Sequence, residues 1–225
     1  MLSAVIVAGG SSRRMGFDKT FALVAGKPVV AHSIAAFERT ASVAEIIIVG
    51  REERLPELEE VVARERFGKV RCVVAGGVQR QDSVANGLRE SREQFVAVHD
   101  AARPLITPEQ IERVFAQCRI NGAAALASPV KDTLKRADGE RVVIGSISRE
   151  DVYAMETPQI FARDLILRAY ETVRAQQLTI TDEVSAIELL QHEVRLVPND
   201  QPNFKITYPA DLPLAELILN QRSDG

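Results

Sequence analysis

Several features that would assign a protein to a class at once are missing from this sequence. Only two cysteines are present, Cys72 and Cys118, and each lies in an apolar run, where a thiol acts as a small hydrophobic side chain. Neither has the spacing of a metal ligand, so no disulfide framework or cysteine metal site is expected. No apolar run reaches the ~18 residues of a membrane span, and residues 1–8 form no basic leader. We therefore expect a soluble, cytoplasmic protein.

An excess of positive charge is also missing. The 28 Lys and Arg residues are balanced by 31 Asp and Glu residues, which gives a net charge of −3. Such a balance provides no general field for nucleic acid or an anionic membrane, so neither is an expected partner, and any anion site must be local. With 225 residues, 46% of them hydrophobic, the chain has enough apolar material for one large α/β domain.

Short apolar runs alternate with stretches of helical spacing. The runs at 2–8, 45–49, 70–75, 95–98 and 123–127 each end at glycine or polar residues and predict buried strands. The alternation predicts a mostly parallel sheet covered on both faces, with ligands beyond the carboxyl ends of the strands. We expect four loops at that rim: 9–19, 76–83, 99–104 and 128–133.

Helix starts and later elements can also be placed. Thr107 can cap a helix whose first residue is Pro108, and Gln110 completes a capping box. The rest of the chain predicts helices at 165–175 and 181–191, strands at 194–197 and 204–207, and a last helix from near Pro209.

Segment 131–159 breaks the alternation of strands and helices. It mixes polar residues with a short run at 141–144, next to a hairpin-like turn at Asp138-Gly139. We interpret 131–159 as a β-arm that projects from the main sheet and packs against a second subunit. It is thus an insertion in a single domain spanning 1–225.

The loop after the first strand has the composition of a phosphate-binding loop. Residues 9–19 read GGSSRRMGFDK, so that small residues let backbone N–H groups approach a phosphate while Arg and Lys supply positive charge. The loop matches neither the P-loop nor the dinucleotide-binding glycine pattern. The alternative is a flexible surface loop with incidental charges.

The segment 98–104 carries a candidate metal ligand. Asp100 directly follows an apolar strand, a position that suits Mg²⁺, which takes one or two carboxylates together with substrate phosphates. A turn cap is the alternative for Asp100. His99 has no second candidate ligand beside it, so a hydrogen-bonded structural role is favoured over catalysis.

Two further segments complete the predicted rim. Residues 76–84 join a strand to a helix through two glycines and would admit a flat base, with Ser83 either reading a base edge or capping the helix. Lys205 is the only cation in the late apolar run 203–207, where it either binds phosphate or extends to solvent.

Taken together, these residues resemble the 2-C-methyl-D-erythritol 4-phosphate cytidylyltransferase family of the non-mevalonate isoprenoid pathway. The resemblance covers almost the whole chain. The motifs that carry it are Ala8-Gly9-Gly10 with Arg13-Arg14-Met15 and Lys19, Gly76-Gly77 with Arg80 and Ser83-Val84, Val98-His99-Asp100-Ala101-Ala102-Arg103-Pro104, Lys131-Asp132-Thr133, Thr157-Pro158-Gln159, Thr181-Asp182-Glu183, and Asn203 with Lys205-Ile206-Thr207.

The resemblance implies a Rossmann-like three-layer α/β nucleotidyltransferase fold that transfers CMP from CTP to methylerythritol phosphate, with Mg²⁺ as cofactor. It implies a homodimer in which the 131–159 arm reaches the partner's site. The roles it implies are catalysis by Arg14, Lys19 and Lys205, cytidine nucleotide binding by Ala8, Gly9, Gly10, Gly77, Ser83 and the Mg²⁺ ligand Asp100, and acceptor binding by Arg103, Thr133, Arg149, Thr157 and Thr181.

Three positions depart from the family pattern. Asp18 precedes Lys19 where the family usually has Pro. The resulting Gly-x-Asp-Lys sequence is more similar to that of the guanylyltransferases of molybdenum cofactor synthesis. Pro202 stands where an acidic residue is common, which leaves a second metal carboxylate open. Glu156 adds a negative charge beside Thr157, near the expected phosphate site.

Other functions remain as alternatives. A ribitol-5-phosphate cytidylyltransferase has the same architecture, but such enzymes tend to carry Ser-Val at Ala101-Ala102. A non-catalytic nucleotide-binding module is disfavoured by the loop cations, Asp100 and Lys205, and an NAD-dependent oxidoreductase by the missing glycine spacing.

Overall fold

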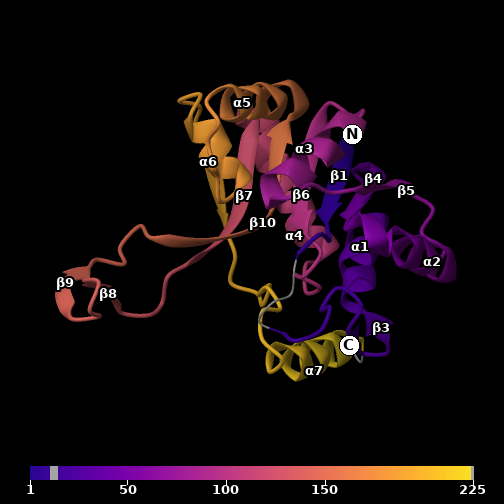
Figure 1. The fold of residues 1–225 in the computed structure, drawn as a ribbon, viewed down its shortest axis with the longest axis horizontal. Coiled ribbons are helices and arrows are strands. Elements are labelled where there is room, and N and C mark those ends of the chain that lie inside the picture. Colours follow the sequence, from indigo (N-terminus) through magenta and orange to yellow (C-terminus); the bar gives the residue numbers. More distant parts are fainter. Residues whose placement is uncertain (11–14, 224–225) are drawn as a thin grey trace.

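A seven-stranded sheet forms the centre of the protein, in a computed structural model that describes residues 1–10 and 15–223 (Figure 1). Its strand order is β11-β7-β10-β6-β1-β4-β5. The bounds of these strands are β1 (Leu2–Val7), β4 (Val43–Gly50), β5 (Val70–Ala75), β6 (Phe95–Asp100), β7 (Ala123–Pro129), β10 (Tyr153–Ala162) and β11 (Arg195–Pro198).

All neighbouring strands of this sheet run parallel except β10, which is antiparallel to both β6 and β7. The five apolar runs of the first half form β1, β4, β5, β6 and β7, as predicted. The four strands β1, β4, β6 and β7 are mostly buried and mostly apolar, as expected for strands covered on both faces, whereas the edge strand β5 is partly exposed. The prediction of a mostly parallel α/β sheet is confirmed.

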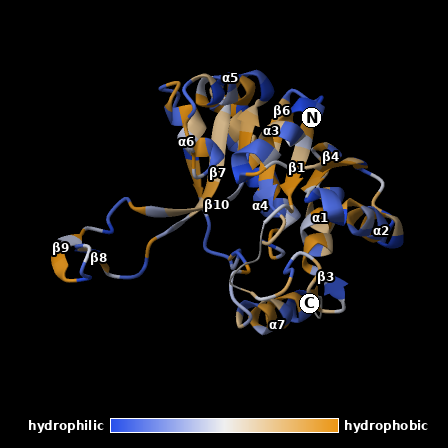
Figure 2. Cartoon of the chain, viewed as in Figure 1, coloured by the Kyte–Doolittle hydropathy of each residue, from blue (hydrophilic) through white to orange (hydrophobic). Residues whose placement is uncertain are grey.

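Helices cover both faces of the sheet, which gives three layers. Phe37, Leu58 and Phe115 belong to the core on one face of the sheet, and Leu88 and Phe161 belong to the core on the other. The first face is covered by α1 (Val29–Arg39), α2 (Leu55–Glu65) and α4 (Pro108–Asn121), and the second by α3 (Arg80–Glu90), α5 (Arg163–Ala175) and α6 (Glu183–Glu188). Figure 2 shows the apolar strands between the helices.

The predicted helix at Thr107 begins as expected. The Thr107 hydroxyl accepts a hydrogen bond from the Gln110 backbone N–H, and the Gln110 side chain accepts one from the Thr107 N–H in return. Gly122 ends α4 with a φ of 87°, a left-handed conformation that glycine adopts without strain.

A smaller unit lies beneath the sheet. It consists of the two-stranded pair β2 (Leu23–Val24) and β3 (Lys27–Pro28) and the last helix α7 (Asp211–Ser223), while the short helical turn η1 (Glu52–Arg54) joins β4 to α2. Leu105, Ile206 and Ala215 form part of its core. Residues 204–207 form no strand, so that prediction was wrong: Ile206 is buried against the α7 unit, and its N–H donates to the Ala102 carbonyl.

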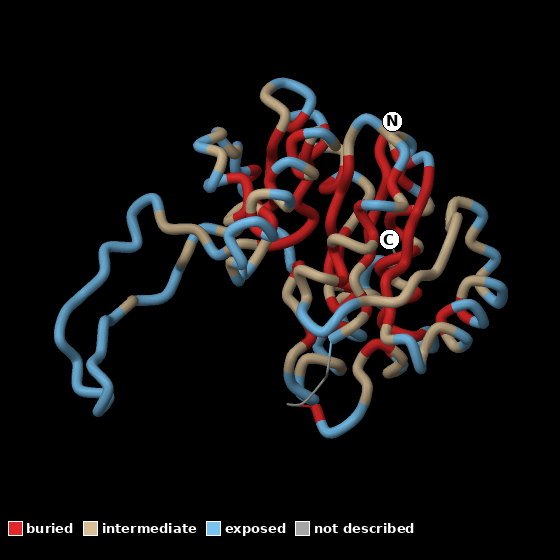
Figure 3. The backbone as a smooth tube through the Cα atoms, turned by 45° about the horizontal axis from the view of Figure 1, so that its top comes forward, coloured by how far each residue is buried: buried red, intermediate tan, exposed pale blue. Residues whose placement is uncertain are grey.

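The arm projects from the sheet as a hairpin of β8 (Leu134–Ala137) and β9 (Val143–Ile147), far from the helices in Figures 1 and 3. Asp138 closes its turn, because its Oδ1 accepts from the backbone N–H groups of Glu140 and Val142 at 2.9 Å. The predicted arm extended too far, to 159. From Tyr153 onward the chain is already strand β10 of the main sheet. Across the described residues, no helix is long and apolar enough to span a membrane.

Candidate active site

The loops after β1, β5 and β6 enclose a cleft of about 630 Å³ at the carboxyl rim of the parallel strands. This is the edge at which ligands bind in parallel α/β sheets. The fourth predicted rim loop, 128–133, does not line this cleft in the described structure and leads into the arm instead. Predicted residues that line the cleft are Ala8, Gly9, Gly10, Lys19, Gly77, Ser83, Asp100 and Lys205.

The loop after β5 requires glycine because the start of α3 lies close against it. A Cβ on Gly76 would stand 2.5 Å from Ser83 Oγ, and one on Gly77 would stand 2.3 Å from Asp82 Cβ. The helix is capped by a reciprocal pair, Gln79 and Asp82, and not by Ser83. The buried Ser83 hydroxyl instead accepts from the Gly77 N–H at 3.1 Å, so it fixes the loop that forms one wall of the cleft.

Two cations hold the buried carboxylate of Asp100. Arg80 donates to Oδ1 from Nε at 3.1 Å, and Lys205 donates to Oδ2 from Nζ at 2.7 Å. Burial alone would raise the pKa of Asp100, but Arg80 and Lys205 hold it well below its usual range. The carboxylate is therefore charged at any pH near neutrality, and each of its oxygens is bound by one of these cations.

Arg80 is held in turn by a second carboxylate. Its Nη1 and Nη2 donate to the two oxygens of Glu183 at 2.7 and 3.1 Å, and Glu183 has no exposed surface. Burial by itself would lower the pKa of Arg80, whereas Glu183 and Asp100 raise it. The guanidinium thus stays charged and links the first residue of α6 to the end of β6.

His99 lies beneath the cleft floor and is fully buried. Its Nε2 is 3.2 Å from the Arg103 carbonyl, which can only accept, so Nε2 carries the proton and Nδ1 accepts from the Thr157 hydroxyl at 3.0 Å. Thr157 Oγ1 in turn accepts from the Asp100 N–H at 3.1 Å. Burial lowers the pKa of His99 to about 3, so the imidazole is neutral. The geometry agrees with the predicted structural role.

The lysine of the first loop reaches the same cleft from the opposite side. Lys19 Nζ donates to the Ile206 carbonyl at 2.7 Å, which places it on the segment that carries Lys205. The preceding Asp18 accepts from the Thr20 N–H at 3.0 Å and forms an ion pair with Arg51. The loop end is therefore fixed by side chains of the residues that follow β4.

Comparisons with known proteins agree with this geometry. The family model of IspD, 2-C-methyl-D-erythritol 4-phosphate cytidylyltransferase, matches residues 2–221. The chain belongs to this family. It is 39% identical over 223 residues to the enzyme of that name from Halalkalibacterium halodurans, covering 98% of this chain and 97% of the relative, and 39% identical over 222 residues to that of Dehalococcoides mccartyi, covering 98% and 96%.

Solved structures of family members have the same fold. The 4-diphosphocytidyl-2C-methyl-D-erythritol synthase of Anaerococcus prevotii superimposes with a TM-score of 0.86 at 28% identity, covering 98% of both chains. The 2-C-methyl-D-erythritol 4-phosphate cytidylyltransferase of Thermus thermophilus gives a TM-score of 0.81 at 30% identity, covering 96% of this chain and 98% of that one. The protein is accordingly a transferase of the cytidylyltransferase class, within the nucleotidyltransferases.

The departures from the family pattern have structural explanations. Asp18, where the family has Pro, fixes the loop through Thr20 and Arg51. From the sequence we expected Glu156 to add negative charge near the phosphate site. Glu156 is not among the residues that line the cleft, and its Oε2 accepts hydrogen bonds from the side-chain amides of Asn199 and Asn203 at 2.9 and 2.8 Å. Pro202 supplies no second carboxylate, and Asp100 is the single acidic residue among the described residues that line the cleft.

Several residues expected to bind the acceptor lie outside the cleft of their own chain. Arg103 was expected at the phosphate rim but donates below it to the carbonyls of Asn203 and Met155, at 2.8 and 3.3 Å. Thr157 is buried with its hydroxyl between His99 and Asp100. These two side chains support the cleft from beneath rather than line it.

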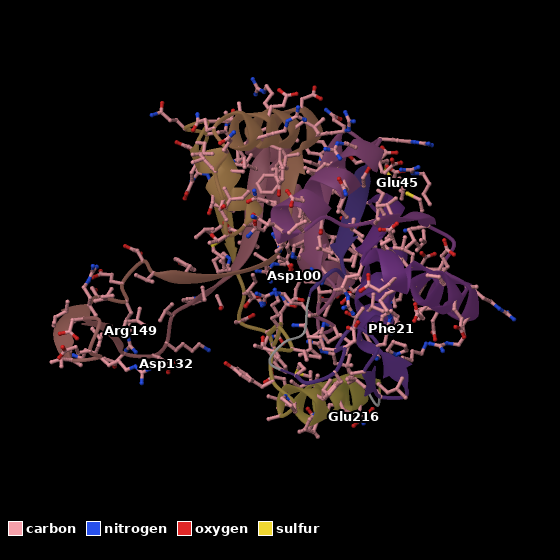
Figure 4. The ribbon with its side chains drawn as sticks, in the orientation of Figure 1. Phe21, Glu45, Asp100, Asp132, Arg149 and Glu216 are labelled. Carbon is pink, nitrogen blue, oxygen red and sulfur yellow. The ribbon has the colours of Figure 1, made fainter. Side chains whose placement is uncertain are left out.

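The remaining predicted residues lie farther away. Thr181 is exposed, with its hydroxyl 3.3 Å from Ser185 Oγ. Thr133 and Arg149 belong to the arm, and Figure 4 shows Arg149 far from Asp100. Arg149 donates to the Lys131 carbonyl within the arm. Arg14 lies outside the described residues.

Arg80 and Glu183 were given no role by sequence reasoning, although both stand in the family motifs. One signal was available for Arg80. It is the first residue of α3, where a cation opposes the helix dipole at a modest cost, so an anionic partner could have been sought for it. Glu183 offered no such signal, because an acidic residue at a helix start is ordinary.

The residues present fit a metal that arrives with its substrate. Among residues 1–10 and 15–223, no three His, Cys, Asp or Glu side chains gather as a metal-binding cluster. Asp100 offers a single charged carboxylate at the cleft. One carboxylate plus phosphate oxygens is the donor set that Mg²⁺ takes at nucleotide sites, so Asp100 would hold Mg²⁺ carried by a triphosphate.

Proposed function

We propose that this chain transfers CMP from CTP to 2-C-methyl-D-erythritol 4-phosphate, giving 4-diphosphocytidyl-2-C-methyl-D-erythritol and pyrophosphate. Family membership over residues 2–221 supports the reaction. The observation that carries it is the meeting of Lys19, Lys205, Arg80 and Asp100 around one cleft with glycine-rich walls. This arrangement provides positive charge and backbone N–H groups for a triphosphate in a chain whose net charge is −3.

The proposed reaction needs alignment and charge neutralisation rather than a protein nucleophile. A 4-phosphate oxygen forms a bond with the α-phosphorus of CTP, the bond from the α-phosphorus to the bridging oxygen breaks, and pyrophosphate leaves with the electron pair. Lys19 would stabilise the charge of the triphosphate and of the leaving pyrophosphate, as would Arg14. Lys205 would leave Asp100 Oδ2 and neutralise the α-phosphate. Mg²⁺, when bound, supplies further charge neutralisation at the phosphates.

The base side of the cleft is the glycine wall. Ala8, Gly9, Gly10 and Gly77 lack side chains that would block a flat base, and Ser83 holds this wall in place. Cytosine would therefore be selected mainly by backbone groups. Thr157, Arg103 and Thr181 would support or bind the acceptor from the β10 and α6 side.

The arm is proposed to complete a site in a homodimer. Val142, Val143 and Ile144 are each more than half exposed, and Figure 2 shows this apolar patch at the end of the arm. Exposed apolar patches of this kind mark interaction sites. Thr133 and Arg149 would then serve the acceptor in the partner's cleft. The cytoplasmic location expected from the sequence stays a prediction.

Pyrophosphate release tests the reaction. The purified chain is incubated with Mg²⁺, each of the four nucleoside triphosphates, and either methylerythritol phosphate or ribitol 5-phosphate. We expect release with CTP and methylerythritol phosphate. Release with ribitol phosphate alone would overturn the proposed acceptor, and no release with any pair would favour a nucleotide-binding module.

Mixing two inactive variants tests the shared site. Lys19→Ala removes a cleft residue, and Arg149→Ala removes an arm residue. If the arm serves the partner's cleft, hybrid dimers contain one intact site, and activity of the mixture rises above that of either variant alone. Sedimentation of the unmodified chain provides the control, because a monomer at assay concentration would contradict the proposed dimer directly.

A further inference from the structure

Arg80 occupies a position that disfavours a cation. It is the first residue of α3, where the helix dipole is positive, yet its guanidinium lies between the carboxylates of Asp100 and Glu183, with 29% of the side chain exposed. The positive charge that Arg80 brings to the cleft does not by itself explain why it is held between two carboxylates. The two carboxylates offset the cost of placing a cation there. The question is therefore what Arg80 does for these carboxylates.

The two cations on Asp100 are held very differently. Arg80 contacts Oδ1 through both Nε and Nη2, at 3.1 and 3.0 Å, and its Nη1 and Nη2 also donate to the two oxygens of Glu183. Lys205 contacts Oδ2 through one ammonium on a flexible stem, and 39% of its side chain is exposed. A planar guanidinium fixed by a fork of bonds keeps its geometry, whereas an ammonium is a point charge that rotates and exchanges.

Glu183 is itself fixed from the side away from the cleft. Its backbone N–H donates to Gln159 Oε1 at 3.1 Å, and the Tyr170 hydroxyl donates to its Oε1 at 3.0 Å. Charged contacts and hydrogen bonds therefore run without a break from α5 through Glu183 and Arg80 to Asp100. Such outer partners determine how a metal ligand is oriented.

We propose that Arg80 is a positioning residue: locked by Glu183, it retains Oδ1 of Asp100, so that Oδ2 is the oxygen offered to a divalent cation once Lys205 moves to a phosphate. The inference rests on the proposed function in one respect, that the cation arrives with a nucleoside triphosphate. If the proposal holds, affinity for the divalent metal ion depends on the forked geometry of Arg80 and not on its charge alone.

Binding of Mn²⁺ in the presence of CTP tests this directly. Free Mn²⁺ is followed by its electron paramagnetic resonance signal while the full-length chain is titrated. Arg80→Lys keeps the charge but loses the fork, and the double variant Arg80→Gln/Glu183→Gln removes both members of the buried pair, so that neither is left unpaired. We expect the Mn²⁺ dissociation constant to rise roughly 10–100-fold in both.

The matched control is Arg89→Gln. Arg89 lies on the same helix, is exposed, and contacts the Asn86 side chain at 2.6 Å. Its Mn²⁺ affinity should equal that of the unmodified chain. Turnover adds a second readout, because loss of positioning lowers kcat and leaves KM for the acceptor unchanged, whereas general loosening of the fold changes both.

The outcomes separate clearly. Unchanged Mn²⁺ affinity in a folded Arg80→Lys or double variant overturns the proposal. If neither variant folds by circular dichroism, Tyr170→Phe decides, since it removes only the hydroxyl bound to Glu183: weaker Mn²⁺ binding supports the proposal and unchanged binding overturns it. A chain that releases no pyrophosphate with any acceptor refutes the proposed function, while the Mn²⁺ titration still reports on Arg80.

Discussion

Thr157 and His99 face each other beneath the cleft, with 3.0 Å between the threonine Oγ1 and the imidazole Nδ1. Because His99 Nε2 donates to the Arg103 carbonyl, the threonine hydroxyl must donate to Nδ1, and its oxygen remains to accept from the Asp100 N–H. The main chain of Asp100 is thereby fixed by a neutral imidazole. Each partner has one possible proton arrangement, and protonation of the ring would break it.

This pair predicts how stability changes with pH. The folded pKa of His99 is about 3, below the 6.5 of an unperturbed histidine, so between these values the unfolded chain binds the extra proton. The unfolding free energy therefore falls as pH falls from 6.5, by roughly 1.4 kcal/mol per unit from this residue. In His99→Asn, which cannot titrate, the deficit relative to the unmodified chain should shrink by about 2–3 kcal/mol between pH 7.5 and 4.5. Urea denaturation at both pH values measures it, and an equal deficit at both would contradict the assignment.

The carboxylate of Glu156 predicts a difference between two substitutions. Glu156→Ala removes one of the two acceptors of each buried amide, so that Asn199 keeps its bond to the Gln201 carbonyl and Asn203 keeps its bond to the Thr157 carbonyl, and each N–H left unpaired costs roughly 1–3 kcal/mol. Glu156→Gln keeps an oxygen for both amides and should cost about 1 kcal/mol. Thermal or urea unfolding compares them. Equal stability of the two variants would show that the amides are not held by this oxygen.

Gly87 is predicted to resist the smallest possible substitution. An alanine normally stabilises a helix by about 1 kcal/mol relative to glycine, but a Cβ here would stand 2.4 Å from Val5 Cγ1 and 2.9 Å from Val49 Cγ2. Gly87→Ala should therefore lower the unfolding free energy by roughly 1–3 kcal/mol. Gly145→Ala in the arm, where a Cβ meets nothing within 4 Å, is the control and should stay within about 0.5 kcal/mol. A stabilised Gly87→Ala would mean that α3 lies farther from the sheet.

Lys19 predicts a separation of activity from stability. Its ammonium lies at the cleft on the Ile206 carbonyl, where it would meet the triphosphate. Lys19→Ala should lower kcat roughly 100-fold or more and change the unfolding free energy by less than about 1 kcal/mol. Lys27→Ala removes an exposed lysine paired with Glu65 and should leave kcat unchanged. Near-normal turnover of Lys19→Ala would refute the role given to Lys19.

The sequence predicted what depends on local pattern. Apolar runs that end in glycine or polar residues located the parallel strands, and the Thr107 to Gln110 pattern located the start of α4. The residues around the cleft were found because strand ends of a parallel sheet share one rim. Lys205, 105 positions after Asp100 in the chain, lies in a segment that forms no strand, and the family resemblance placed it at the phosphate site.

What could not be predicted depends on tertiary direction. The guanidinium of Arg103 could bind a phosphate, but the turn after β6 directs this side chain to backbone carbonyls below the cleft. Segment 204–207 is apolar because Ile206 packs with α7, a reason that a strand pattern does not distinguish. The end of the arm was placed too late because the turn at Glu150 and Asp151, where Asp151 has a φ of 58°, was not recognised as the boundary before β10.

Strand β10 gives the arm and the cleft a common support. The polypeptide that returns from the hairpin enters the sheet at Tyr153, and its pairing with β7 is interrupted between Met155 and Gln159. That interruption is where Thr157 meets Asp100 and His99, and Gln159 receives the Glu183 N–H just beyond it. A partner bound to the hairpin is therefore connected, through β10, to the residues that position Asp100. The arm and the residues that orient Asp100 lie on one continuous stretch of backbone.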